Sequence, residues 1–388
     1  MTSPLPPPSW LDSALNFCIA KTRHNLATLA SFPERTEGGQ WVQIDPNRHG
    51  WWVGGHWVGL LWLAHATTGD PALAAAARDW GNRLLPQLND QADHDLGFLF
   101  ELGFLLGNQI TGDERLKAPA LQAAAILSRR YNPRGQFIQA WGPLDAPPEL
   151  RGRTIMDTMM NLDLLFWAST ATGDPRYAEI AAAHARTTLT YHLRPDNSTA
   201  HVCDFDPERG VFLKQDTHQG LSATSCWSRG QAWGVYGFAD CYRATQDPVF
   251  LDASRRLMTY LWPRLPADLV PFWDFDSPLI PNDVRDSSAA AILASGLLSL
   301  AAIENDPYLA GIWETRAVSI LASLWQNYTS RDTGEASLLV HGTRSKPHNL
   351  FDHGLIYGDY YFLEALVRLS KPAAPSWPTL TIQQLRPT

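Results

Sequence analysis

The amino-acid sequence predicts an all-α fold in which six inner and six outer helices close into a double ring, an (α/α)6 barrel. Two observations predict it. A signal that ends one helix and starts the next recurs five times, at Asp70, Asp113, Asp174, Asp247 and Asp306. The helix before each signal carries almost no charge, whereas the helix after it is amphipathic, so buried inner helices and exposed outer helices alternate along the chain.

Each signal can be explained by the residue types that form it, as in "TGDPALAAA" around Asp70. Glycine accepts the left-handed conformation that ends a helix. Aspartate then caps the next helix by accepting from its free amide groups, and proline favours the first helical position. Five signals therefore predict five helix–turn–helix hairpins. Their unequal spacing argues against an open solenoid, which needs repeats of fixed length.

The expected helices follow in chain order. An amphipathic outer helix covers 10–31, and an outer helix follows each of the five signals. The nearly uncharged inner helices are expected over 53–66, 97–107, 155–171, 227–242, 287–303 and 355–369. The apolar run 287–303 is only marginally long enough to cross a bilayer, so we interpret it as a buried helix.

Composition limits the function. The 388 residues are enough for a sizeable core, and the net charge of −8 provides no basic field for nucleic acid or an anionic membrane. We expect one catalytic domain over 1–388, with a Pro-rich segment at 1–8 and an extended tail at 372–388. The opening "MTSPLPPPSW" has no basic region followed by an apolar core, so a cytoplasmic protein is expected. No oligomeric state is predicted.

Motifs that the sequence lacks exclude several chemistries. The four cysteines have no CxxC spacing, so they are expected to be free thiols rather than a zinc or redox site. There is no HExxH motif, no glycine-rich phosphate loop and no GxSxG elbow. We therefore expect no metal and no cofactor, and the absences argue against kinases, dehydrogenases and esterases.

The barrel predicts where functional residues meet. If the hairpins alternate in direction, the inner helices run parallel and their N-termini lie at one mouth. Asp95 precedes the second inner helix and Asp157 opens the third. Trp227 and Arg229 open the fourth, and Asp286 caps the fifth. These residues are expected to share one cavity, which faces helix N-termini and therefore favours anions.

Asp95 and Asp157 lie beside apolar helices, where a carboxylate is costly unless it is paired or used. Two carboxylates in one cleft suggest general acid–base chemistry on a sugar. The alternative is that both are helix caps. Asp157 and Asn161 are four residues apart and would share a helix face toward the barrel interior, whereas a cap needs no polar neighbour there. Asp163, deeper in the same helix, is expected to be structural.

Aromatic and histidine side chains near the mouth are candidates for ligand contact. Most of the sixteen tryptophans supply core volume, but some lie close to glycine or polar residues. The tryptophans placed to offer flat faces to a ligand are Trp51, Trp52, Trp57, Trp141, Trp227 and Trp233. His94, His201 and His218 lie in loops or at helix mouths, where a histidine is more often a structural hydrogen-bonding group than a catalyst.

Six sequence blocks together resemble glycoside hydrolase family 88, the unsaturated glucuronyl hydrolases. They are "DHDLGF" at 93–98, "QAWG" at 139–142, "IMDTMMN" at 155–161, "WSRGQAWGVYGF" at 227–238, "RDSSAAAILASGLL" at 285–298 and "IYGDYYFLEAL" at 356–366. The similarity runs from about Trp52 to Leu369. The resemblance implies an (α/α)6 barrel, in agreement with the helix pattern. It also implies a substrate made by a polysaccharide lyase, an oligosaccharide that ends in a 4,5-unsaturated uronic acid.

The resemblance implies roles for matching residues. Asp157 looks like the catalytic acid/base and Asp95 like its partner carboxylate, with His94 beside it. The other matches line the substrate pocket: Trp141, His201, Gln219 and Trp227 around the unsaturated uronic acid, and Arg229, Trp233 and Trp52 around the next sugar, with Asn161 facing the same cavity.

The stretch "HGTRSKPHNL" at 341–350 falls in a loop that varies among relatives. Ser345 and Lys346 resemble the residues of relatives that accept sulfated substrates. The alternative is a solvated basic loop. His56 stands where an aromatic residue is expected, on the side of the leaving sugar.

The implied reaction begins with protonation of carbon 4 by Asp157. The ionised carboxylate then activates a water that adds to carbon 5, and collapse of the hemiketal opens the ring and releases the neighbouring sugar. We expect burial and the charge of Asp95 to raise the pKa of Asp157, the two carboxyls to share one proton, and activity to peak at mildly acidic pH.

Two alternatives stay open. One is an unsaturated rhamnogalacturonyl hydrolase acting on pectin fragments. The other, from a different class, is a sugar epimerase or a non-catalytic carbohydrate-binding barrel that uses the tryptophans as a platform.

Overall fold

A computed structural model describes residues 7–90, 92–148 and 151–370, and two rings of helices dominate it. The inner ring consists of α2 (Gly54–Thr68), α4 (Leu96–Phe100) with its continuation α5 (Leu106–Thr111), α7 (Leu162–Thr172), α9 (Ser228–Thr245), α11 (Ser287–Ile303) and α13 (Ile356–Ser370). The outer ring consists of α1 (Leu11–Thr28), α3 (Pro71–Asn82), α6 (Lys117–Arg129), α8 (Pro175–Tyr191), α10 (Pro248–Leu261) and α12 (Pro307–Ser323). The predicted tail at 372–388 and most of the Pro-rich segment lie outside the described residues.

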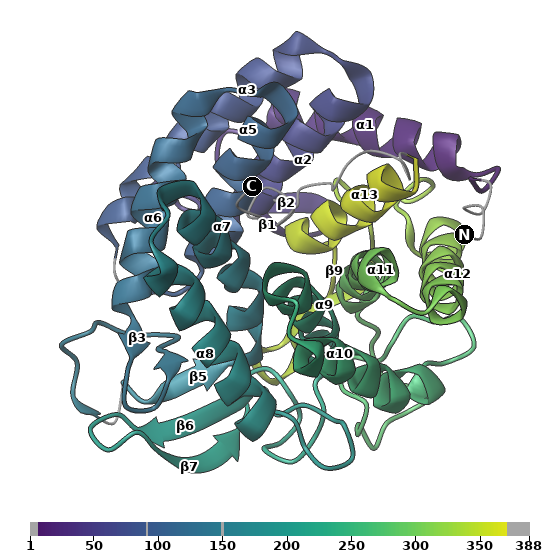
Figure 1. Cartoon of the computed structure of the whole chain (residues 1–388). Coiled ribbons are helices and arrows are strands. Elements are labelled where there is room, and N and C mark those ends of the chain that lie inside the picture. The colour runs from purple at the N-terminus through teal and green to yellow at the C-terminus, as the bar shows by residue number, and fades with distance from the viewer. Residues whose placement is uncertain (1–6, 91, 149–150, 371–388) are drawn as a thin grey trace.

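The inner ring is closed. Each inner helix packs against the next one in chain order, and α13 packs against α2, so the last inner helix meets the first. Figure 1 shows the outer helices around them: α3, α6, α8, α10 and α12 each pack against the inner helix that precedes them in the chain, and α1 packs against α13 and α2. An open solenoid cannot make the contact between α13 and α2, so the predicted (α/α)6 barrel is confirmed.

The five predicted hairpin signals form as expected. Asp70, Asp174, Asp247 and Asp306 each cap an outer helix by accepting from the backbone amide two residues on, at 2.9–3.1 Å. Asp113 does the same for a short 3-10 turn that leads into α6. Gly69, Gly112 and Gly173, which precede three of these aspartates, have φ between 70 and 74°, the left-handed conformation that ends the inner helix.

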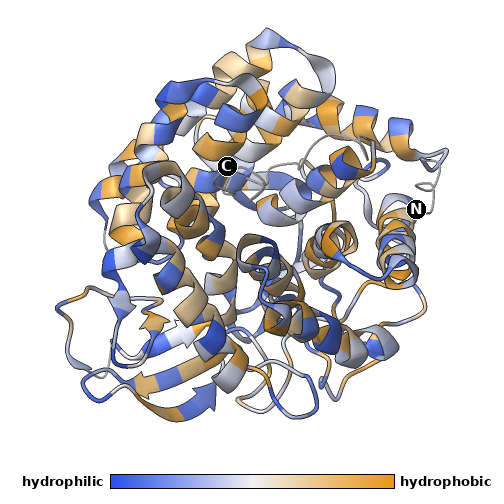
Figure 2. Cartoon of the chain, in the orientation of Figure 1, coloured by the Kyte–Doolittle hydropathy of each residue, from blue (hydrophilic) through white to orange (hydrophobic). Residues whose placement is uncertain are grey.

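The two rings differ in polarity as predicted. Residues 228–242 of α9 are all buried, and α11 has the bounds expected for the buried apolar run at 287–303. Figure 2 shows apolar and polar residues alternating along the outer helices, whose apolar sides face the inner ring. All four cysteines are buried and unpaired. In the described ranges, no helix combines the length and the apolar character needed to cross a membrane.

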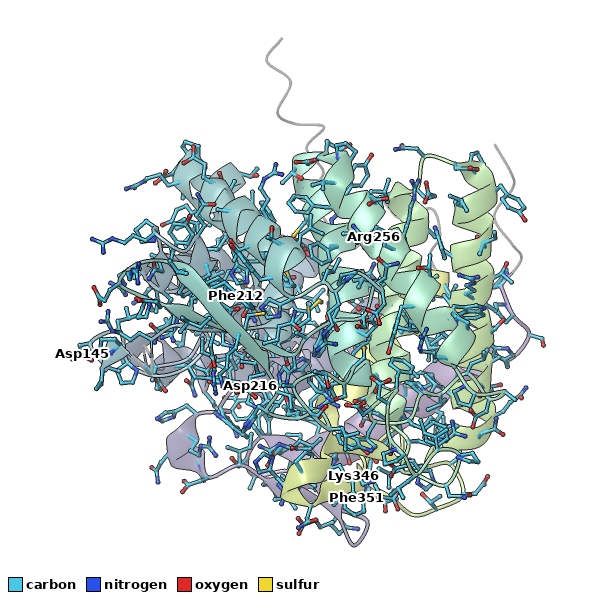
Figure 3. The ribbon with its side chains drawn as sticks, turned by 90° about the horizontal axis from the view of Figure 1, so that it is seen from below. Asp145, Phe212, Asp216, Arg256, Lys346 and Phe351 are labelled. Atoms are coloured by element: carbon cyan, nitrogen blue, oxygen red, sulfur yellow. The ribbon has the colours of Figure 1, made fainter. Side chains whose placement is uncertain are left out.

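Short strands lie in the long loops, and the helix pattern did not predict them. They are β1 (Pro33–Glu37), β2 (Gln40–Gln43), β3 (Tyr131–Asn132), β4 (Phe137–Ile138), β5 (Arg153–Ile155), β6 (Val202–Asp206), β7 (Val211–Asp216), β8 (Gly342–Ser345) and β9 (Leu350–His353). The largest sheet has the order β5-β6-β7, and β8 pairs with β9. Figure 3 shows Phe212 and Asp216 on β7 and Lys346 and Phe351 on the C-terminal hairpin, at the face seen from below.

Candidate active site

The predicted convergence of inner-helix N-termini is present. Asp95 immediately precedes α4, and Asp157 lies in a 3-10 segment, η6 (Met156–Asn161), that leads into α7. Trp227 precedes α9 and Asp286 precedes α11. The contacts described below join these positions, so one mouth of the barrel collects the residues that the sequence scatters.

The alternative that Asp95 and Asp157 are helix caps is wrong. Asp95 directly precedes α4 but its side chain makes no capping hydrogen bond, and Asp157 lies inside η6, where Ile155 occupies the capping position. Asp286, by contrast, does cap α11 by accepting from the amides of Ser288 and Ala289. Asp157 Oδ2 is buried and has no hydrogen-bond partner among the described residues. A buried carboxylate oxygen left open in this way is available to a ligand or a water.

Strand pairing brings Asp157 to His201. Strand β5 runs into η6, and β6 begins directly after His201. The antiparallel register pairs Ile155 with Val202, and the amide of Met156 donates to the carbonyl of His201 at 3.0 Å. As a result His201 Nε2 lies 3.6 Å from Asp157 Oδ2. This contact depends on a sheet that the sequence analysis missed.

His201 has a fixed tautomer. Its Nδ1 accepts from the backbone amides of His218 and Gln219, both at 3.2 Å, so Nδ1 carries no proton. Burial lowers the pKa of His201 well below its ordinary value, which keeps the ring neutral. The single ring proton is therefore on Nε2, the atom that faces Asp157. His201 is therefore placed to donate a hydrogen bond toward the Asp157 carboxyl or a ligand beside it.

Asp157 is held as a weak acid. Burial raises its pKa from 3.8 to about 6, and the charge of Arg229 is the largest effect acting in the opposite direction. The expected direction of the shift is confirmed, and desolvation causes it. The expected sharing of one proton with Asp95 is not tested by these shifts and stays a prediction. The pKa of Asp95 is itself raised well above its ordinary value, first by burial and then by the charges of Asp93 and Asp157.

Gly97 lets the chain after Asp95 pack directly against the chain after Asp157. Asn161 Nδ2 donates to Asp95 Oδ1 at 3.3 Å, and Asn161 Oδ1 accepts from the amide of Phe98 at 3.0 Å. A Cβ on Gly97 would lie 2.6 Å from the Cα of Asn161, so the two backbones touch there. The sequence analysis placed Asp157 and Asn161 on one face of an α-helix; the segment is instead 3-10, and Asn161 bridges to Asp95.

Tryptophans and a tyrosine form the walls. The ring of Trp227 packs at a tilt of 38° against His201 with centroids 4.5 Å apart, and Trp141 packs edge-on against His218. Trp52 lies against Tyr357 at 5.2 Å. Trp227 Nε1, Trp233 Nε1 and the Tyr357 hydroxyl are among the buried donor groups that have no hydrogen-bond partner within the described residues. Unsatisfied donors beside aromatic faces suit a polar ring such as a sugar.

Two predicted platform residues have their rings engaged by other side chains. Trp57 packs edge-on against Trp80 of the outer helix α3, so the expectation that it offers a face to a ligand is wrong. Trp51 has φ of 48° and lies against the guanidinium groups of Arg48 and Arg344. Its flat faces are therefore engaged by arginines.

Arg229 and Gln219 hold the C-terminal hairpin over the site. Arg229 forms a buried ion pair with Asp286 and donates to the carbonyls of Thr343 and Arg344. Gln219 Nε2 donates to the carbonyl of Arg344 at 2.8 Å. The β8–β9 hairpin is thus tied to α9 and α11. These donors bind backbone carbonyls, and the predicted contacts of Arg229 and Gln219 with substrate stay predictions.

The loop at 341–350 is only partly solvated: His341 and residues 347–349 are exposed, whereas Ser345 and Lys346 are covered. Ser345 is buried and its hydroxyl lies 2.7 Å from His348 Nδ1. Lys346 is half-buried, pairs with Asp283 and lies over the ring of Trp273. Figure 3 shows Lys346 at the hairpin, close to Phe351. The role of these residues toward sulfate stays a prediction.

His56 and Asp163 make structural contacts inside the barrel. His56 is fully buried among Trp52, Phe98 and three tyrosines of α13, and burial lowers its pKa to about 3, so it packs as a neutral ring where an aromatic residue was expected. Asp163 forms an ion pair with Arg243, which agrees with its expected structural role.

The sequence analysis missed three residues of the site. Tyr357 presents an unpartnered hydroxyl, Thr158 Oγ1 lies 3.1 Å from His94 Nδ1, and Asp93 Oδ1 accepts from the amide of Asp95 at 3.2 Å. All three lie inside the quoted blocks "DHDLGF", "IMDTMMN" and "IYGDYYFLEAL". Their position in the sequence next to residues that match the family could therefore have indicated them.

Comparison with known proteins agrees with this geometry. The sequence profile of Glycosyl Hydrolase Family 88 matches residues 27–330. The chain belongs to this family. The unsaturated glucuronyl hydrolase of Bacillus sp. (strain GL1) is 37% identical over 383 residues, which cover 94% of this chain and 98% of the relative. Its crystal structure superposes with a TM-score of 0.89 at 36% identity, covering 95% and 98% of the two chains.

Two further relatives are named for related substrates. The unsaturated chondroitin disaccharide hydrolase of Streptococcus pyogenes serotype M1 is 35% identical and covers 95% of this chain and 93% of the relative. An Asp-to-Asn variant of the Streptococcus agalactiae unsaturated glucuronyl hydrolase, complexed with dGlcA-GalNAc6S, has a TM-score of 0.81 at 30% identity, covering 96% and 94%. The chain is therefore a glycoside hydrolase.

Proposed function

We propose that this family 88 hydrolase removes the 4,5-unsaturated uronic acid from the non-reducing end of oligosaccharides that polysaccharide lyases release. The observation that carries the proposal is Asp157, a buried carboxyl whose pKa is raised to about 6 and whose Oδ2 has no partner among the described residues. Such a group carries a proton at mildly acidic pH and can deliver it. The names of the relatives from Bacillus and Streptococcus support the same substrate class.

The first step is proton transfer to carbon. The carbon 4–carbon 5 double bond of the substrate is a vinyl ether, so its electrons take the proton of Asp157 at carbon 4. Positive charge then develops at carbon 5 and at the ring oxygen. Asp157 is left ionised, and the Nε2 proton of His201, 3.6 Å from Oδ2 in the free enzyme, is placed to stabilise the new charge.

The second step adds water. The ionised Asp157 takes a proton from a water molecule while the water oxygen bonds to carbon 5, which restores the protonated carboxyl. The resulting hemiketal opens to a ketone at carbon 5, and its ring oxygen becomes a hydroxyl on carbon 1. That hemiacetal collapses to an aldehyde and expels the neighbouring sugar as an alcohol. One water is consumed, and no covalent enzyme intermediate is needed.

The remaining residues position the substrate. The unpartnered Trp227 and Trp233 indoles and the Tyr357 hydroxyl can bond to sugar oxygens, and Asp95, held by Asn161, can accept from a sugar hydroxyl. Removal of any of these should raise KM more than removal of Asp157 does. Family membership supports hydrolysis over epimerisation or binding without catalysis.

The test is Asp157→Asn with unsaturated disaccharides prepared from glycosaminoglycans, ulvan, gellan and xanthan. Turnover is followed as loss of the ultraviolet absorbance of the conjugated alkene, and binding is followed by calorimetry. We expect no measurable turnover with binding retained, and normal turnover for the matched variant Asp163→Asn, whose folding is checked by circular dichroism. Near-normal activity of Asp157→Asn, or no activity of the natural chain on any of these substrates, would overturn the proposal.

We also propose that 1–388 acts as one catalytic domain in the cytoplasm. Buried residues from Leu11 to Leu369 belong to one hydrophobic cluster, which supports a single domain. The four buried, unpaired cysteines suit a reducing compartment. Activity assays on separated cell fractions of the source organism test the location, and activity confined to the culture medium would contradict it.

A further inference from the structure

Three consecutive residues at the mouth, Asp93, His94 and Asp95, direct ligand-type atoms at one point. His94 Nε2 lies 3.9 Å from Asp93 Oδ1 and 3.5 Å from Asp95 Oδ1, and all three atoms lie within 4.8 Å of one another. His94 is fully buried, yet its Nε2 has no hydrogen-bond partner among the described residues. A buried imidazole nitrogen that faces two carboxylates without bonding to either indicates a missing ligand.

The spacing suits a transition-metal ion after a small adjustment. Ligand atoms about 2.1 Å from a tetrahedral zinc ion lie about 3.4 Å apart. The 3.5 Å from His94 Nε2 to Asp95 Oδ1 is close to that value, and a small rotation of the Asp93 side chain would shorten the 3.9 Å to Asp93 Oδ1. Thr158 Oγ1, 3.1 Å from His94 Nδ1, can accept a hydrogen bond from a proton held on Nδ1 and leave the Nε2 lone pair directed at the ion. An imidazole with two carboxylates favours zinc or its neighbours over magnesium or calcium.

We propose that Asp93, His94 and Asp95 form an inhibitory binding site for a divalent transition-metal ion such as Zn²⁺. Each carboxylate oxygen keeps a lone pair for the ion: Asp93 Oδ1 accepts from the Asp95 amide, and Asp95 Oδ1 accepts from Asn161. The bound ion is coordinated by Asp95. It therefore prevents this carboxylate from accepting a hydrogen bond from a sugar hydroxyl, the contact that the proposed function gives to Asp95.

Charge and access both permit an ion there. Asp157 and Asp90 add negative charge near the cluster, whereas the buried guanidinium of Arg130 acts against a cation; its donors include bonds to the carbonyls of Gln139, Ala140 and Gly142. A cavity of about 570 Å³ beside Trp51 and Trp52 is lined by Asp93 and Asp95. The ion can therefore reach the cluster from solvent through this cavity, which also borders Trp52 of the proposed sugar pocket.

The experiment is calorimetric titration of the whole chain with ZnCl₂ and, separately, MgCl₂. We expect one zinc site in the natural chain, at least tenfold weaker binding in Asp93→Asn, and binding within twofold of the natural chain in Asp90→Asn, a neighbouring acid outside the cluster. Magnesium should bind at least tenfold more weakly than zinc. Equal zinc binding in the natural chain and Asp93→Asn, or no binding in either, would overturn the proposal.

A second measurement does not depend on a variant. Crystals of the natural chain soaked in ZnCl₂ should give an anomalous peak between Asp93, His94 and Asp95, and a peak only elsewhere would contradict the site. Zinc should also lower kcat/KM in competition with substrate, and Asp93→Asn should relieve that inhibition at least tenfold. Since binding and diffraction need no turnover, failure of the proposed hydrolysis would leave those results intact.

Discussion

Asp157→Asn is expected to make the protein more stable at neutral pH, although it removes the proposed catalytic acid. The Asp157 side chain is 14% exposed, and burial raises its pKa from 3.8 to about 6. Above pH 6 the carboxyl is ionised in the folded and the unfolded chain, and keeping that charge buried costs about 3 kcal/mol, because each pKa unit corresponds to about 1.4 kcal/mol. Asparagine has nearly the same shape and carries no charge.

The pH dependence has a definite sign. Because the folded-state pKa is raised, the natural chain gains stability from this group as pH falls from 6 toward 4, while the asparagine variant does not. The advantage of the variant should be about 3 kcal/mol at pH 8 and about 1 kcal/mol at pH 4.5. Urea unfolding followed by circular dichroism at both pH values measures it.

Asp163→Asn is the matched control, since it changes a carboxylate of the same chain segment that is paired with Arg243. It should lower the free energy of unfolding by about 1–3 kcal/mol at pH 8, because Arg243 loses a partner. If Asp157→Asn were also destabilising at pH 8, Asp157 would be a stabilising partner in the folded chain, and the argument for a desolvated acid would fail.

Three further outcomes are expected. The value of kcat/KM should fall above pH 6, because Asp157 then loses the proton it must donate; a rate constant that stays level up to pH 8 would count against this. Arg229→Met should lower the free energy of unfolding by about 3–5 kcal/mol in urea titrations, because it leaves Asp286 buried without its cation, and a loss under 1 kcal/mol would contradict the ion pair. Lys346→Ala should lower kcat/KM for sulfated and unsulfated disaccharides within twofold of each other, because Asp283 already pairs with the ammonium; a loss confined to the sulfated substrate would show that Lys346 binds sulfate.

The helical part of the fold could be predicted because its signals are local. A glycine, a capping aspartate and a proline act within one turn, and the absence of charge along 287–303 is visible without knowing its neighbours. The parallel inner helices then place Asp95 and Asp157 at one mouth by topology alone.

What could not be predicted depends on contacts between distant segments. The contact of His201 with Asp157 requires the pairing of β5 with β6, two strands of three and five residues whose pattern is too short to recognise. The hydrogen bonds of Arg229 go to carbonyls of the C-terminal hairpin, which follows it in the sequence by more than a hundred residues. Trp57 has polar neighbours in sequence but core neighbours in space.

The close packing of Gly97 on Asn161 makes residue 97 a position at which the geometry of the site can be changed. Because its Cα rests directly on the backbone of Asn161, a methyl group added there cannot be absorbed by rotating a side chain; one of the two segments has to move. Gly97→Ala would therefore alter the interval between the carboxylates of Asp95 and Asp157 while leaving both acids chemically unchanged. Substitutions of increasing size at position 97 would test how strongly the reaction rate depends on the distance between the Asp95 and Asp157 carboxylates.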